Sequence, residues 1–223
     1  MTPTRLRAVA IALLAACSGG SGGTPTSRIQ VGMSADLVDT LFELHVSLRE
    51  SDEAIEPYIL AGDEELVATL DGESHVLQRG EFDNAISFRI GSPLTEDMPL
   101  VVALHRPTDT DALSSQVLVP ATHTVSATDP TPLSQDITFT WTPSGSDAEL
   151  AWDVDGACAT GNGPVRGDPG GITIPANALT TGSGPCSGTV TVVKQRSGTV
   201  DPHFSFGTIS VRHRQRTSVN FVP

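Results

Sequence analysis

The chain has 223 residues, with 13 lysines and arginines against 26 aspartates and glutamates, a net charge of −13. This balance excludes a broad nucleic-acid-binding surface, because neutralising phosphates is the main source of such binding. The length suits two domains of about 100 residues each after a short N-terminal segment.

The N-terminal segment has the residue order of an export signal. Arg5 and Arg7 precede an apolar run over residues 8–16, and small residues follow it. The run is too short for a membrane-spanning helix, which needs about 20 residues. Residues 19–23 spell G-x-S-x-G around Ser21, but the strand and helix that a nucleophilic serine needs are missing from the sequence on either side. The glycines and serines here predict a flexible tether.

Leu14-Ala15-Ala16-Cys17 resembles the lipobox of the bacterial lipoproteins that signal peptidase II cleaves. The resemblance implies a signal peptide over residues 1–16, and a Cys17 that carries a diacylglycerol on its sulfur and usually an acyl chain on its amino group. Two or more chains give stable anchoring, whereas one gives marginal binding. Ser18, in place of an aspartate, implies sorting to the outer membrane in a host with two membranes. An ordinary secretory signal that contains a cysteine is the alternative.

The segment over residues 28–121 is predicted to be an acidic β-sandwich domain that follows a tether over residues 17–27. Apolar residues recur there with a period of two, which predicts an all-β protein. Residues 41–49 alternate most clearly, and Asp71-Gly72 between two apolar-rich runs predicts a hairpin. About seven short antiparallel strands give two sheets packed face to face. Besides the alternating strand and the hairpin, the predicted strands cover residues 29–33, 85–90, 100–105 and 116–119.

The segment over residues 122–223 is predicted to form a second β-sandwich domain with one disulfide. Trp141 and Trp152 fall on the apolar faces of alternating segments and are expected in the core. The fold class is therefore all-β, with two tandem antiparallel β-sandwich domains. The architecture resembles immunoglobulin-like and fibronectin-like sandwiches, although Trp141 precedes both nearby cysteines and the antibody Cys…Trp…Cys order is absent. An architecture of this kind implies no particular activity.

Cys158 and Cys186 remain as a pair once Cys17 is assigned to lipid. Export places them in a compartment that permits disulfides, so we expect them to be bonded. A metal site is the alternative, but the chain has no C-x-x-C pair and no histidine close to these cysteines in the sequence.

The glycine-rich stretch DVDGACATGNGPVRGDPGG is predicted to form a loop and offers a candidate calcium site. Asp153, Asp155, Asn162 and Asp168 lie in or beside it, and calcium prefers clustered oxygen ligands. Their spacing fits no EF-hand, and turns in β proteins use Asp, Asn and Gly for backbone reasons alone. We therefore expect no cofactor, with calcium as the alternative. The histidines on predicted strands, at positions 45, 75 and 105, lack metal-ligand spacing.

The last strand offers a candidate interaction face. Arg212, Arg214 and Arg216 share one parity, and apolar residues share the other, so the three arginines should line one exposed face. Residues 28–122 carry a net charge of −13 and residues 123–223 a net charge of −2. The acids opposite the arginines could belong to the first domain, to a neighbouring molecule or to a partner. A solvated strand face is the alternative.

Together these features predict a lipid-anchored protein of the cell envelope, acting as a non-catalytic binding or structural module. The membrane, reached through the N-terminal lipid, is the expected partner, and an envelope protein is a further candidate. The alternatives are an envelope hydrolase or other enzyme with a site built from loops, and an accessory subunit of an envelope assembly. Aromatic residues make up 4% of the chain, which disfavours a stacking platform for carbohydrate.

Overall fold

The computed structural model describes residues 23–38, 41–50, 57–79, 86–91, 94–182 and 184–223. The predicted signal peptide, the lipobox and Cys17 lie outside the described residues. Strands dominate the described part, with two short 3₁₀ helices, so the predicted all-β class is confirmed. No helix in these ranges is long and apolar enough to cross a membrane.

The first body is a sandwich of two sheets built mainly from the first half of the chain. One layer is the four-stranded sheet β4-β3-β7-β8, and the other contains β1, β2, β6 and β5. Its elements are η1 (Thr26–Arg28), β1 (Ile29–Val38), β2 (Leu41–Glu50), β3 (Glu65–Leu70), β4 (Glu73–Val76), β5 (Gln78–Arg79), β6 (Ile86–Gly91), β7 (Pro99–His105) and β8 (Ala112–Leu118).

The second body is also a sandwich. The sheet β14-β11-β9 faces a layer that contains β15, β13, β12, β16 and β17. Its elements are β9 (Thr124–Ala127), β10 (Thr131–Pro132), β11 (Ile137–Thr142), β12 (Glu149–Gly156), β13 (Ala159–Val165), β14 (Gly171–Ile174), η2 (Ala176–Ala178), β15 (Thr180–Thr181), β16 (Cys186–Ser197) and β17 (Phe206–Val222).

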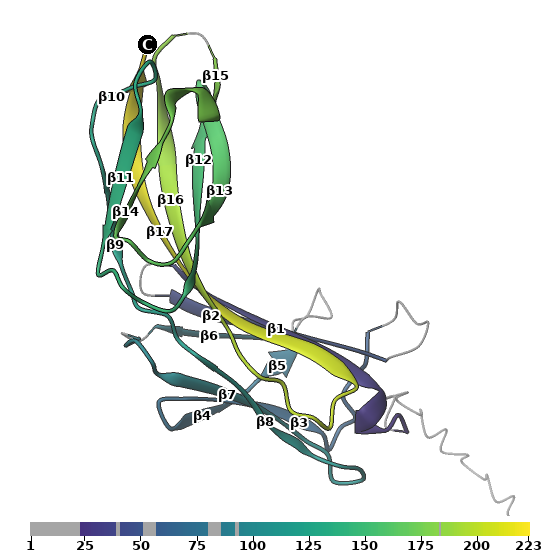
Figure 1. The fold of residues 1–223 in the computed structure, drawn as a ribbon. Helices are drawn as coiled ribbons and strands as arrows, with labels where there is room; N and C mark the ends of the chain where they lie inside the picture. The colour runs from purple at the N-terminus through teal and green to yellow at the C-terminus, as the bar shows by residue number, and fades with distance from the viewer. Residues whose placement is uncertain (1–22, 39–40, 51–56, 80–85, 92–93, 183) are drawn as a thin grey trace, which may run out of the picture.

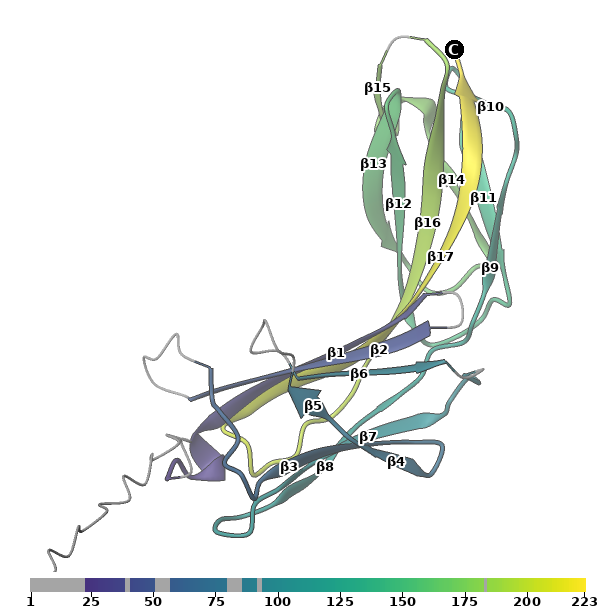
Figure 2. The ribbon, with the colours of Figure 1, turned by 180° about the vertical axis from the view of Figure 1, so that it is seen from behind.

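One sheet runs through both bodies, which meet at a bend (Figures 1 and 2). Its strand order is β15-β13-β12-β16-β17-β1-β2-β6-β5. The 17-residue strand β17 links the two halves. Its first part pairs in parallel with β1, from Gln30↔Phe206 to Val38↔Arg214, and it pairs along β16 from Ser210 onward. At about 3.3 Å per residue, β17 extends roughly 55 Å and forms a backbone common to both bodies.

The alternation predicted for the strands is present in the structure. Phe42, Leu44, Val46 and Leu48 of β2 are buried, as are both tryptophans. In β17 the odd-numbered positions Ile209, Val211, Val219 and Phe221 are buried. The first pair belongs to the core of the first body and the second pair to the core of the second. A single alternating strand therefore supplies two hydrophobic cores.

Two features of the sheets differ from the sequence-based expectation. The pairings of β17 with β1 and with β10 are parallel, in a fold that is otherwise antiparallel. The core of the first body also includes Phe204, Ile209 and Val211, which lie far beyond residue 121. The chain returns to the first body near its C-terminus, because β1 would otherwise leave an unpaired edge there.

The predicted hairpin at Asp71-Gly72 is present. Leu70 pairs with Glu73, which leaves a two-residue turn whose φ angles are 53° at Asp71 and 79° at Gly72. Positive φ at both positions is the geometry that favours the Asp-Gly sequence.

The glycine-rich stretch after Asp155 contains a strand rather than forming one long loop. β13 pairs with β12 from Leu150↔Val165 to Gly156↔Ala159. Gly163 faces the core, where an added Cβ would lie 3.1 Å from Nε1 of Trp152. The glycine leaves room for a buried indole, so its role is packing as well as chain flexibility.

Candidate functional site

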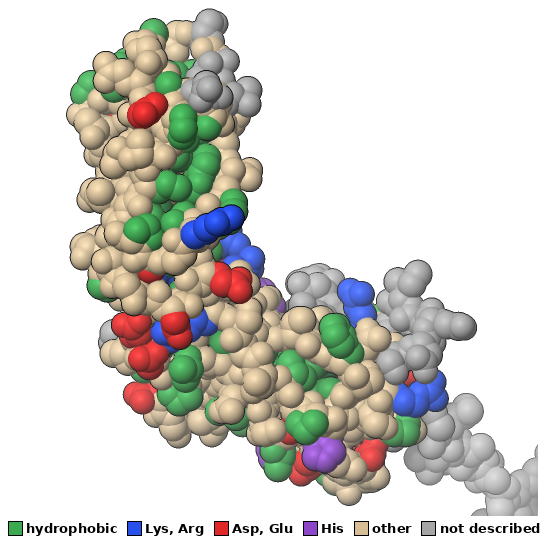
Figure 3. All heavy atoms as spheres, in the orientation of Figure 1, with side chains coloured by type: hydrophobic (Ala, Val, Ile, Leu, Met, Phe, Trp, Pro, Cys, Tyr) green, Lys and Arg blue, Asp and Glu red, His purple; other side chains and the backbone are tan. Residues whose placement is uncertain are grey.

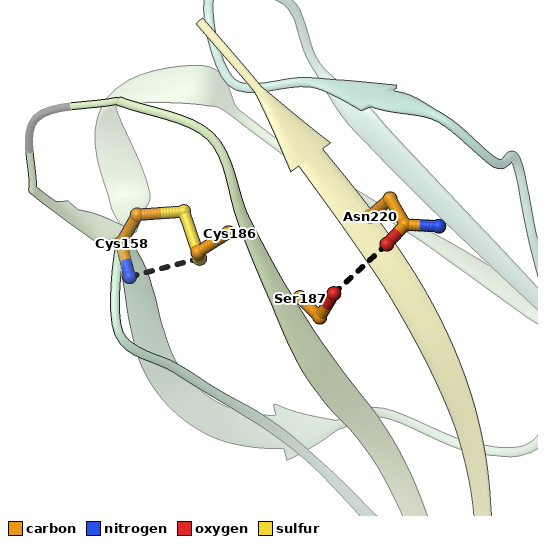
Figure 4. The surroundings of a disulfide bond; sticks show 4 residues. All are labelled: Cys158, Cys186, Ser187 and Asn220. Atoms are coloured by element: carbon orange, nitrogen blue, oxygen red, sulfur yellow. Dashed lines mark hydrogen bonds between the residues drawn. A yellow bond between two sulfur atoms is a disulfide. The ribbon is translucent and has the colours of Figure 1, made fainter.

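The disulfide between Cys158 and Cys186 is confirmed. The two Cα atoms are 5.7 Å apart, and the backbone N–H of Cys158 lies 2.9 Å from Sγ of Cys186 (Figure 4). The bond ties the turn between β12 and β13 to the start of β16. Next to it, Ser187 Oγ donates to Asn220 Oδ1 at 2.9 Å, which links β16 to β17. The disulfide therefore fastens the end of the second body farthest from the bend.

The structure does not bring all four candidate calcium ligands together, because Asp168 lies apart from Asp153, Asp155 and Asn162. Asp153 pairs with Asn162 across β12 and β13, and Asp155 pairs with Thr160 further along. Asp168 lies beyond the other end of β13, where it accepts a hydrogen bond from Lys194 Nζ at 2.7 Å. Within the described ranges, no group of three or more His, Cys, Asp or Glu side chains is placed to hold a metal ion.

Asp168 and Lys194 form a fully buried ion pair near the bend. Asp168 Oδ1 accepts from Nε1 of Trp141 at 2.6 Å, and Oδ2 accepts from Oγ of Ser146 at 2.6 Å. Lys194 also donates to the carbonyl oxygen of Pro143 at 2.9 Å. Burial alone would raise the pKa of Asp168, but the hydrogen bonds from Lys194, Ser146 and Trp141 hold that pKa well below its usual range. The pair fixes the loop that leads from β11 to β12.

Two buried histidines lie beside this pair. His213 of β17 and His123 approach each other with their Nδ1 atoms 2.8 Å apart, and Nε2 of His123 lies 3.1 Å from the carbonyl oxygen of Val192. Burial and the neighbouring His213 and Lys194 lower the pKa of His123 to about 4, so this ring is neutral at pH 7. The histidine pair was not predicted from the sequence, although His213 has the same parity as Val211 and Val219, which are buried in β17.

Two of the three candidate arginines bind an acid of the first body. Arg212 Nη2 donates to Asp36 Oδ2 at 2.8 Å, and Arg214 Nε donates to Asp36 Oδ1 at 3.0 Å. Asp36 lies on β1 directly opposite Arg212 in the register. Arg216 is exposed and lies opposite Thr191 of β16. Arg212 and Arg214 therefore hold β17 against the C-terminal end of β1.

The Arg212→Ser/Arg214→Ser variant is expected to lower the free energy of unfolding by at most about 2 kcal/mol, because each partly exposed pair is worth about 0 to 1 kcal/mol. The arrangement of the bodies should not change, since the backbone of β17 spans both. Urea unfolding and small-angle scattering measure the two effects, with Arg216→Ser as the matched control. A change in the maximum dimension of the double variant, but not of Arg216→Ser, would contradict the expectation that the backbone of β17 maintains the arrangement of the two bodies.

Arg196 of β16 clamps the two bodies together at the bend. Its guanidinium pairs with Asp97 and with Glu96, the latter at 3.7 Å, and both acids belong to the first body. It also pairs with Asp147 of the second body. Burial alone would lower the pKa of Arg196, but the hydrogen bonds to Asp97 and Asp147 outweigh it and raise that pKa above its usual value. The side chain is 11% exposed, so it lies beneath the acids that it binds.

Next to Arg196 the surface is hollowed. One groove of about 470 Å³ lies between residues 195–199 and the end of β8, with Leu118 in its lining. A second groove of about 550 Å³ lies over β12 and β16, with Val193 in its lining. Both are lined by Asp147, Glu149 and Gln195, so they adjoin each other, and we call the two hollows together the bend groove. Acidic side chains gather at the bend in Figure 3.

The bend groove combines apolar and acidic side chains. Leu118 is 45% exposed, so it offers apolar surface to a ligand in the groove. Asp147 and Glu149 stand at the point where the two hollows join. An apolar floor with a few fixed charges is typical of a binding surface. The sequence offered no signal for this site, because its residues come from five separate strands and three loops.

These features define an all-β protein of two sandwich bodies that share a sheet and a groove at their junction. No family model and no curated protein matches the chain. Among solved structures it is similar to the FN1–FN3 domains of chicken CNTN1, with 11% sequence identity and a TM-score of 0.32 over 86% of this chain and 69% of that one.

Proposed function

We propose that this protein is a lipoprotein of the cell envelope, anchored through Cys17, that acts as a non-catalytic binding module. The observation that carries the proposal is the sequence Leu14-Ala15-Ala16-Cys17 after a short apolar run. Ser18 supports the outer membrane as its location where the host has two membranes. The bend groove supports a binding role, because it presents exposed apolar surface beside fixed charges.

The attachment of the N-terminal segment to the first body supports a close approach to the membrane. Arg106 Nη1 donates to the carbonyl oxygen of Thr24 at 2.8 Å and to Oγ1 of Thr26 at 3.0 Å. Thr24 Oγ1 also donates to Glu50 at 2.7 Å. Between Cys17 and Thr24 the chain has six residues, which reach roughly 20 Å at full extension.

The position of this attachment would orient the molecule. Helix η1 lies at the end of the first body that points away from the second body (Figures 1 and 2). A lipid on Cys17 would therefore hold the first body near the bilayer and leave the second body and the bend groove farther out. The module would present the groove at a distance set by the first body.

Replacing Cys17 with serine tests the anchor in the native host. The Cys17→Ser protein is expected to leave the membrane fraction, because no acyl chain can then be attached. Ser18→Asp is the matched variant: it should stay membrane-bound and move from the outer to the inner membrane in a host that has both. If Cys17→Ser remains in the membrane fraction after washing with high salt, the lipid anchor is wrong.

A further inference from the structure

We propose that the bend groove binds an extended, basic and partly apolar peptide segment of a partner protein. This inference rests on the proposed binding role and names the chemistry of the partner. The charge at the rim, the exposed apolar residues of the floor and the shape of the groove support it.

The acidic side chains at the edge of the groove favour a positively charged ligand. Asp147 and Glu149 line the groove, and Arg196 is the basic residue in its lining. Glu96 and Asp97 lie beside it as ion-pair partners of Arg196. The side chains of Asp97 and Asp147 are 66% and 79% exposed, whereas Arg196 is 11% exposed. A ligand that approaches from solvent therefore meets carboxylate oxygens before it meets the guanidinium. Lysine or arginine side chains complement this rim, and phosphates or acidic peptides are repelled by it.

The apolar residues at the bottom of the groove favour a ligand that carries apolar side chains between its positive charges. Leu118 is 45% exposed beside Pro99 in the lower hollow, and Val193 lies beside Ala151 and Pro164 in the upper one. Covering these groups removes apolar surface from water. A metal ion or a small polyamine would leave that surface uncovered. A peptide that carries both kinds of side chain uses the whole groove.

The shape of the groove favours an extended segment. Its upper part lies over the outer face of β12 and β16, where Ala151 and Val193 are register partners. Its lower part reaches the end of β8 at Leu118. Side chains of an extended peptide alternate in direction, so every second residue can face such a surface. A segment in which basic and apolar residues take turns at every second position therefore presents both kinds of side chain to the groove.

The test measures the affinity of the purified full chain for a synthetic ten-residue peptide in which lysine and leucine take turns at every second position, with serine between them, by calorimetry at low and high salt. We expect Asp147→Asn/Glu149→Gln to weaken binding about three- to tenfold at low salt. The control is Asp153→Asn/Asp155→Asn, which removes two acids from β12, the strand that carries Glu149, outside the groove. It should have little effect.

A second pair of variants tests the floor. Leu118→Ser should weaken binding of the same peptide, whereas Leu113→Ser should not, because Leu113 is equally exposed on β8, at 46%, but lies outside the groove. The proposal is supported if the affinity for the peptide falls in Asp147→Asn/Glu149→Gln and in Leu118→Ser but not in their control variants. Equal losses for the two acidic pairs, or no binding of the peptide, overturn it. Because Cys17 plays no part in this measurement, such a failure would leave the anchor standing.

Discussion

Replacing Arg106 with methionine is expected to lower the free energy of unfolding by about 3 to 5 kcal/mol, because it strands a buried carboxylate. Arg106 and Glu64 have fully buried side chains, and Arg106 Nε donates to Glu64 Oε1 at 2.7 Å. Arg106 Nη2 also donates to Oη of Tyr58 at 2.8 Å, and that hydroxyl lies 2.8 Å from Glu64 Oε2. The three side chains form a closed network inside the first body.

The surroundings of Tyr58 keep its hydroxyl protonated, as a donor in this network must be. Burial is the main cause that raises the pKa of its hydroxyl, and the hydrogen bond to Glu64 raises it further. The phenol therefore stays protonated and donates to the carboxylate, while Arg106 supplies the compensating charge.

Urea unfolding of Arg106→Met measures the loss, and Arg106→Met/Glu64→Gln is the matched variant. The double variant should be more stable than the single one, because the stranded charge is gone. The single variant should also loosen the attachment of Thr24 and Thr26, which proteolysis near these residues would reveal. A loss below about 1 kcal/mol for Arg106→Met would contradict a buried, structural ion pair.

Removing the disulfide with Cys158→Ser/Cys186→Ser is expected to cost about 3 to 4 kcal/mol. The bond closes a loop with a sequence separation of 28 residues, and loop-closure entropy in the unfolded chain gives a value of this size. The loosening should begin near Ala157, at the far end of the second body.

Hydrogen exchange locates the effect of losing the disulfide. Amides of β13 should exchange faster in the double variant, whereas those of β1 and β2 should keep their protection, because they lie in the first body. The oxidised and reduced forms of the unaltered protein provide the matched comparison. Faster exchange throughout both bodies would show that the bond supports the whole shared sheet instead of one end.

The strands and the hairpin could be predicted because their signals are local. Alternation in β2 and the Asp-Gly turn are properties of a few adjacent residues. The pairing of β1 with β17 joins positions 30–38 to positions 206–214, and no local pattern specifies it. For the same reason Asp36 could not be named in advance as the acid opposite Arg212.

The buried charged side chains could not be predicted from local sequence patterns either. Lys194 and Arg106 are charged residues that are expected on the surface by type. Each is buried against an acid that is distant in the sequence, Asp168 for Lys194 and Glu64 for Arg106. The glycines of β13 were interpreted as loop residues because their packing partner, Trp152, lies on the neighbouring strand. Composition indicates flexibility in such a stretch, whereas the tertiary contacts determine the structure.

The most direct test of the proposed anchor is the mass of the N-terminal peptide of the protein extracted from native membranes. We expect a peptide that begins at Cys17 and carries a diacylglycerol on sulfur together with an amide-linked acyl chain. An N-terminus at another residue, or a Cys17 without lipid, would contradict the account.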